Sequence, residues 1–229
     1  KLRSHKDYIG LQKKLISGIE YCFLTTIFLT AFFITFNNQI VQLVFQRGSF
    51  DYSAALKVKN ILIAYAVGIP FYLYRDLLVR TYYSIEKTNF PFKSSFAGII
   101  LNIFFDWFLI GAPINNFGNL SPYNFGVVGI ILSSVIVNFI VCVLLSFNLR
   151  NENIHLPNLD LLRKIILMSL AAFIDSTLCF TILKTTNNFN SNLGEFLLLI
   201  FGSLTFFVIY FFLTKCLKVN RFKVYKKKI

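Results

Sequence analysis

Six long apolar stretches account for most of the hydrophobic positions in this 229-residue chain. An α-helix rises 1.5 Å per residue, so roughly 20 predominantly apolar residues cross the ~30 Å hydrocarbon core of a bilayer. Short polar segments separate the stretches, and we therefore expect neighbouring helices to run antiparallel. The pattern predicts an all-α polytopic membrane protein with six transmembrane helices, at residues 16–45, 60–84, 95–112, 125–147, 161–183 and 193–216.

The first predicted span runs from Ile16 to Phe36 and is taken to continue through the polar triplet Asn37-Asn38-Gln39 to Phe45. Of the basic residues in the flanks, 17 lie on the side of the two chain ends and 4 on the other side. Cytoplasmic loops carry the excess of Lys and Arg. We expect residues 1–15 to be a cytoplasmic or interfacial segment and residues 217–229 to be a basic cytoplasmic tail.

Composition supports a membrane protein and excludes several other classes. Hydrophobic residues make up 56% of the chain and charged residues 14%, with a mean hydropathy of +0.65, whereas soluble domains carry about 25% charged residues. The net charge of +13 lies in the flanks of the spans, so it marks topology and not nucleic-acid binding. The chain does not begin with Met, and we expect it to be a fragment of a longer protein.

Catalytic and metal-binding patterns are missing from the sequence. The four cysteines lie in or at the ends of apolar runs without CxxC spacing, and only two histidines are present, which gives no zinc or disulfide framework. There is no P-loop or GxGxxG motif and no plausible Ser-His-Asp set. We predict a transporter and not an enzyme, with no cofactor apart from a possible sodium ion.

Charged residues inside an apolar span are costly and by default indicate function. The second span holds Arg75, Asp76 and Arg80, and the fifth holds Asp175. Asp76 and Arg80 are spaced i,i+4 and can pair, while adjacent Arg75 and Asp76 point in different directions. Two interpretations remain open for these residues: structural ion pairs, or the lining of a polar transport cavity. Pro70 in the second span predicts a kink.

The third span carries Asn102 and Asp106, which share one helix face at i,i+4. Two oxygen-bearing side chains one turn apart could coordinate a small hard cation, or they could bond a neighbouring helix. Ser133 and Ser134 of the fourth span are candidates for adding hydroxyl oxygens to such a site, although helix packing explains them as well. The sequence alone leaves both interpretations open.

Several motifs, in this order, resemble those of the MurJ (MviN) lipid II flippase family. The segment Leu43–Asp51, just after the first span, is similar to the family's LFxRGxF signature. A later segment is similar to its FYxxxDTxTPxK loop, and Asn102 and Asp106 are similar to polar residues of its next helix. The matching loop positions are Phe45, Arg47, Gly48, Phe50, Tyr83, Thr88 and Pro91.

This resemblance implies that the chain is the last six helices of a fourteen-helix, two-lobed transporter of the MOP exporter superfamily. It implies movement of lipid-linked peptidoglycan precursor (lipid II) across the bacterial inner membrane by alternating access. Asn102 and Asp106 would be two sodium ligands, and the last two spans would hold the polyprenyl tail. The remaining partner would be the missing N-terminal part of the same protein. Lys87 before Thr88, and Asp76, depart from the family pattern.

Three alternatives to a lipid II flippase are compatible with a chain of this kind. A flippase for O-antigen or another lipid-linked polysaccharide would share the same fold. A membrane glycosyltransferase acting on polyprenyl phosphate would need acidic motifs in an aqueous loop. A non-transporting membrane scaffold would need no site at all. The sequence does not specify the exact lipid-linked substrate, the coupling ion or the oligomeric state.

Overall fold

The computed structural model describes residues 8–45, 52–111, 123, 125–152, 154, 156, 158–186 and 192–216. All regular structure in these residues is helical, without a strand, which confirms the predicted all-α class. The elements are α1 (Tyr8–Thr35), α2 (Asn37–Phe45), α3 (Tyr52–Ser84), α4 (Asn89–Ile110), α5 (Val127–Asn148), the 3-10 turn η2 (Leu149–Glu152), α6 (Asn158–Thr186) and α7 (Asn192–Cys216).

Five of these helices, α1, α3, α4, α5 and α6, are long and apolar enough to cross a membrane. The shortest of them, α4 and α5, have 22 residues each, or about 33 Å at the α-helical rise, which matches the hydrocarbon core. The sixth predicted span corresponds to the 25-residue helix α7, whose side chains are described from Ile200 on, and its stretch Ile200–Lys215 is apolar. The chain is therefore a multi-pass membrane protein.

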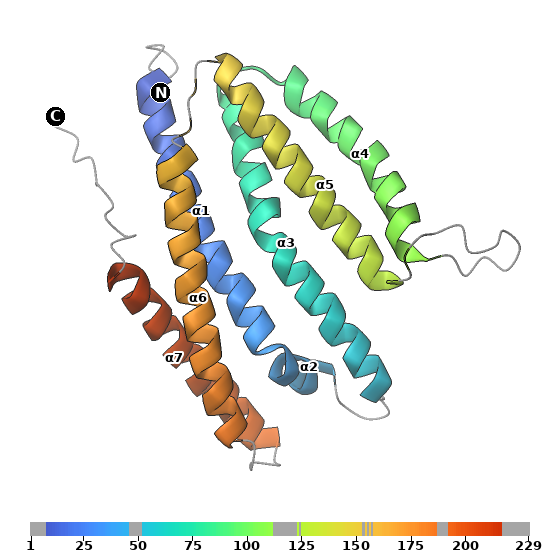
Figure 1. Ribbon diagram of the computed structural model, residues 1–229, viewed down its shortest axis with the longest axis vertical. Coiled ribbons are helices and arrows are strands. Elements are labelled where there is room, and N and C mark those ends of the chain that lie inside the picture. Colours follow the sequence, from blue (N-terminus) through green and yellow to red (C-terminus); the bar gives the residue numbers. More distant parts are fainter. Residues whose placement is uncertain are drawn as a thin grey trace, which may run out of the picture.

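The first predicted span contains a break that the apolar pattern did not reveal. α1 ends at Thr35 and the nine-residue α2 begins at Asn37, with Phe36 as the turn between them. Backbone bonds of α-helical spacing flank this turn, from Phe36 N–H to Phe32 O (2.9 Å) and from Ile40 N–H to Phe36 O (3.0 Å). The Phe36 side chain is fully buried. Asn37-Asn38-Gln39 thus begin a separate short helix, which lies beside the end of α1 in Figure 1.

The helices pack in a row, which Figure 1 shows from one face. α3 lies between α1 and α5, α4 covers the far side of α5, and α6 packs on α1 with α7 beyond it. The largest core cluster joins α1, α3, α5 and α6 through fully buried side chains such as Leu78, Tyr82 and Leu145. A second cluster joins α1, α6 and α7 around Phe36, Cys179 and Phe206.

α3 continues through Pro70 without ending, although proline removes a backbone donor. The missing N–H would have bonded the carbonyl oxygen of Ala66, four residues earlier. Thr30 of α1 donates its hydroxyl to that oxygen at 2.8 Å. A side chain from a neighbouring helix therefore satisfies the carbonyl group, as membrane helices require in the absence of water. This bond also fixes α1 against α3 at mid-helix.

Candidate functional site

Polar side chains of α4 and α5 meet at the interface of these two helices. The hydroxyl oxygen of Ser133 lies 3.2 Å from Asn102 Oδ1 and forms a short hydrogen bond to Asp106 Oδ1. The same hydroxyl lies 2.9 Å from the carbonyl oxygen of Ile130, and the Ser134 hydroxyl lies 3.5 Å from Asn102 Oδ1. Ser133 is fully buried. The structure therefore brings together all four residues considered for a cation site.

This group, which we call the oxygen cluster (Asn102, Asp106, Ser133 and Ser134), has more acceptors than donors. A serine hydroxyl carries a single proton, yet three oxygen atoms surround that of Ser133. A carboxylate, an amide oxygen and hydroxyls are the ligand types that hard cations prefer. The arrangement thus has the chemistry of a site for Na⁺ or a similar ion. Within the described part of the chain, no three His, Cys, Asp or Glu side chains gather as a metal site.

The close approach of α4 and α5 depends on a glycine at the start of α5. A Cβ atom at Gly129 would lie 2.6 Å from the carbonyl oxygen of Leu109 on α4. Two backbone bonds hold the helix ends together, from Phe125 N–H to Leu109 O (3.0 Å) and from Gly126 N–H to Ile110 O (2.9 Å). The oxygen cluster lies one helical turn further along α5, so these contacts set the spacing between its two halves.

A second polar layer joins α3 to the same pair of helices. Arg75 donates from Nη1 to Asn138 Oδ1 on α5 (2.8 Å) and from Nη2 to the Ser95 hydroxyl on α4 (3.0 Å). Asn138 in turn donates to the backbone oxygen of Ser134 (2.7 Å). Among the described residues, no carboxylate contacts Arg75. The guanidinium is therefore held by neutral groups and is linked to the oxygen cluster through Asn138.

The other charged candidates lie elsewhere. Asp76 and Arg80 form the expected i,i+4 ion pair at 2.9 Å, and both side chains are more than half exposed. Such an exposed pair contributes little to stability in water, and it is separate from the Arg75 layer. Asp175 is fully buried on α6, a helix that packs on α1 and α7 and not on α4 or α5. The structure thus divides the sequence candidates among different helix interfaces.

The family-motif positions lie at the ends of α2, α3 and α4. Phe45 is the exposed last residue of α2, and Tyr83 is exposed at the end of α3. Thr88 is the residue before α4, and Pro91 is buried in its first turn, where proline is tolerated. The remaining motif positions Arg47, Gly48 and Phe50 lie outside the described residues.

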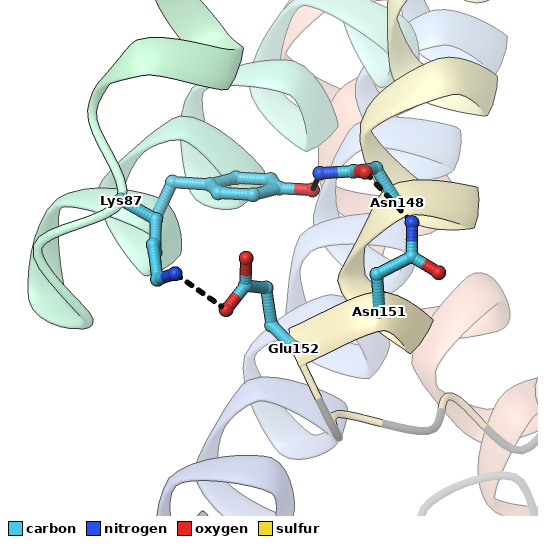
Figure 2. A network of polar contacts seen from close by, with 5 residues as sticks. Lys87, Asn148, Asn151 and Glu152 are labelled. Carbon is cyan, nitrogen blue, oxygen red and sulfur yellow. Dashed lines mark hydrogen bonds and ion pairs between the residues drawn. The ribbon is translucent and has the colours of Figure 1, made fainter.

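A polar network fixes the α3–α4 turn against the end of α5, and sequence reasoning did not predict it. Figure 2 shows Lys87 paired with Glu152 of η2 at 3.5 Å. The Tyr82 hydroxyl donates to Leu145 O at 2.8 Å and accepts from Asn148 Nδ2 at 3.2 Å. Lys87, the residue that departs from the family loop pattern, therefore has a structural partner of its own. Only the three-dimensional packing of α3 on α5 reveals this pairing.

Comparison with known proteins decides the family. A family model described as "Lipid II flippase MurJ" matches residues 1–212. The chain belongs to the MurJ lipid II flippase family. Members of this family are membrane transporters, which agrees with the multi-pass fold.

Individual relatives agree with this assignment. The chain is 38% identical over 138 residues to the probable lipid II flippase MurJ of Synechocystis sp., covering 60% of this chain and 24% of the relative. It is 26% identical over 184 residues to the Thermotoga maritima relative of the same name, covering 80% and 33%. The chain thus spans no more than a third of the curated relatives it matches.

A solved structure supports the fold. The lipid II flippase MurJ in its inward closed conformation superimposes with a TM-score of 0.70 at 24% sequence identity. The match covers 93% of this chain and 40% of that structure. At this identity the likeness establishes the arrangement of the helices, and the roles of single residues have to be argued from their own contacts.

Proposed function

We propose that this chain is part of a flippase that moves lipid-linked peptidoglycan precursor across the bacterial inner membrane by alternating access. The observation that carries the proposal is the oxygen cluster buried between α4 and α5 in a chain of the MurJ family. A transporter performs no covalent step here. It lowers the free-energy barrier to moving a charged headgroup across the hydrocarbon core, because it offers polar groups in place of water while the lipid tail stays in the bilayer.

Sodium binding to the oxygen cluster is the proposed source of coupling. Asp106 would supply the negative charge, and Asn102 and Ser133 would supply neutral oxygens. An ion biases a conformational equilibrium only through different affinities for the two states. Because the four ligand residues are split between two helices, any shift of α4 along α5 would change their distances and hence the affinity for the ion.

The cavity beside α6 supports a place for the polyprenyl tail. A cavity of about 780 Å³ lies between α1, α6 and Pro70 of α3, and its walls are mainly apolar. Phe173 and Phe180 of α6 are among the residues that line it. The tail would therefore lie along α6, where the resemblance places it with the last two spans. The described lining comes from α1, α6 and Pro70 of α3 and does not include α7.

The proposed orientation places both ends of this chain in the cytoplasm, on the basis of the Lys and Arg excess. With this orientation the Lys87–Glu152 network lies at the cytoplasmic face and the turn at Phe36 at the outer face. The inner membrane is the location that the lipid II substrate requires, because the precursor has to leave the cytoplasmic leaflet.

The test uses the protein expressed from its complete gene in a strain depleted of its own lipid II flippase. We expect restored growth, and sodium-dependent transport of labelled lipid II in vesicles made from these cells. Asp106→Asn should reduce the sodium dependence, because it removes the charge from the oxygen cluster. Asp160→Asn, at the exposed start of α6, is the matched control and should behave like the wild type.

Three results would contradict these proposals, each in a different way. Unchanged sodium dependence in Asp106→Asn would refute the cation site while leaving the flippase function intact. Transport of another lipid-linked oligosaccharide without transport of lipid II would favour the polysaccharide flippase instead. Absence of any lipid transport by the folded protein would refute both the lipid II flippase and the polysaccharide flippase.

A further inference from the structure

Asp175 lies near the middle of α6, outside the oxygen cluster and outside the Arg75 layer. Its side chain is 0% exposed. One carboxyl oxygen, Oδ1, accepts from the thiol of Cys179 on the same helix, with the Sγ atom at 3.8 Å. The other carboxyl oxygen, Oδ2, is buried and has no hydrogen-bond partner among the described residues. A carboxyl group with one weak partner therefore lies inside the helix bundle.

In the part of the chain whose side chains are described, the helices packed against α6 bring no counter-charge to Asp175. Between Phe23 and Thr35, α1 contains no titratable residue, and α2 contains none at all. α7 presents Tyr210 from the neighbouring core, but its hydroxyl donates to the Leu24 carbonyl oxygen of α1 at 3.0 Å. Cys179 and Tyr210 are thus the titratable side chains that face Asp175.

Among the residues whose side chains the structure describes, the basic residues near α6 are distant from Asp175 or engaged elsewhere. Lys164 precedes Asp175 by eleven residues on the same helix, which is about 16 Å along the axis, and it pairs with Glu20 of α1 at 2.5 Å. Lys215 is exposed at the end of α7. The first turns of α1 carry Lys13 and Lys14, both exposed. No cation in the described part of the chain is therefore placed to neutralise an ionised Asp175.

Charge is strongly disfavoured in this environment. A buried carboxylate needs a cation or several donors to replace its hydration, and without them the group takes up a proton instead. The same holds with more force at bilayer depth. A protonated carboxyl group is neutral, and it suits a position whose partner Cys179 packs in the apolar cluster of Phe36 and Phe206.

A cavity lies beside this position. The cavity between α1 and α6 is lined by Ala172 and Ser176, which flank Asp175 along the helix. Thr35 of α1 lines the same cavity, and its hydroxyl oxygen is buried and without a hydrogen-bond partner among the described residues. Asp175 is itself fully buried and is not part of the lining, so its carboxyl group reaches the cavity only if α6 moves relative to its neighbours.

We infer that Asp175 is a proton-binding site separate from the oxygen cluster, protonated in this conformation and able to release its proton to water when α1 and α6 move apart. The O–H bond of the acid breaks, its electron pair stays on the carboxylate, and the proton passes to water in the cavity. Proton binding at Asp175 does not depend on the lipid substrate. Only the role of the site rests on the proposed function, and that role is to make the movement of α6 dependent on pH.

The direct test is infrared difference spectroscopy of the protein expressed from its complete gene, in lipid vesicles, as the pH is raised. We expect the wild type to lose a carboxylic-acid C=O band, and the Asp175→Asn protein to lack that change. Asp175→Glu should shift the band and keep the pH dependence, because it preserves the acid. Asp160→Asn, at an exposed position, is the control and should leave the band unchanged.

Thermal stability provides a second measurement that does not depend on the spectra. The wild-type melting temperature should fall as the pH rises from mildly acidic to mildly alkaline, because ionised Asp175 is tolerated in the unfolded state and not in the folded one. In Asp175→Asn this fall should be reduced. A band change that persists in Asp175→Asn, or an equal fall of melting temperature in both proteins, would overturn the inference. Neither outcome depends on transport of lipid II.

Discussion

The crossing of α4 and α5 yields the sharpest stability prediction, because two glycines of the same helix pair differ in the space around them. A Cβ atom at Gly129 would lie 2.6 Å from the Leu109 carbonyl oxygen and 2.8 Å from its carbon. A Cβ atom at Gly98 would meet the side chains of Val137 and Val141 at 3.4 Å, an ordinary contact. Gly98→Ala is therefore a matched control for Gly129→Ala.

The expected magnitudes follow from two opposing terms. Overpacking costs about 1–3 kcal/mol, and the upper end applies at Gly129 because the obstacle is backbone. The Leu109 carbonyl oxygen also accepts the bond from Phe125 N–H and cannot turn away. Replacing a helical glycine by alanine gains up to about 1 kcal/mol, and Gly98→Ala obtains this gain without the clash. We therefore expect Gly129→Ala to be destabilised, and Gly98→Ala to be neutral or slightly stabilised.

The assay is thermal unfolding of the two variants of the protein expressed from its complete gene, in detergent or lipid discs. A difference of about 2–3 kcal/mol between them corresponds to roughly 5–10 °C in melting temperature for a domain of this size. Sodium should also stabilise Gly129→Ala less than the wild type, since the oxygen cluster lies one turn away. Equal melting temperatures for the two variants would refute the argument that backbone contact sets this helix spacing.

Two further predictions concern the α1–α6–α7 side of the molecule. Gly202→Val should destabilise the protein by about 1–3 kcal/mol, because a Cβ atom there would lie 2.7 Å from the fully buried ring of Phe36. Thermal unfolding measures this loss. A variant as stable as the wild type would contradict this packing. Lys164→Gln should cost about 1–3 kcal/mol by leaving Glu20, which is 15% exposed, without its partner, and adding Glu20→Gln should restore part of the loss. Additive effects in that double-mutant cycle would show that the pair contributes nothing.

The helices themselves could be predicted from the sequence because a membrane span is a local property, set by the length of an apolar run. The break at Phe36 was missed for the same reason. Phe36 and Ile40 keep the run apolar, and the turn is stabilised by burial of Phe36 against Cys179 and Phe206, which are distant in sequence. Local polarity at Asn37 was visible, but its consequence depended on contacts that a hydropathy profile does not contain.

The polar sites show the same difference between local contacts, which the sequence predicts, and contacts between helices, which it does not. The i,i+4 spacing of Asp76 and Arg80 was enough to predict their ion pair, and the face shared by Asn102 and Asp106 was visible as well. The partners of Arg75 were not, because Ser95 and Asn138 belong to two other helices. Sequence spacing therefore identifies side chains that can pair within one helix. The partners of Arg75 become known only from the packing of α3, α4 and α5.

The Arg75 layer makes the oxygen cluster part of a three-helix unit. If α4 moves along α5 to change the ion site, Arg75 cannot keep its bonds to both Ser95 on α4 and Asn138 on α5. One of the two bonds has to break, and one Nη atom of the guanidinium is then left without its partner in an environment where that is costly. The cost favours discrete arrangements over continuous sliding. Under the proposed sodium binding, occupation of the oxygen cluster and the position of α3 would thereby be coupled.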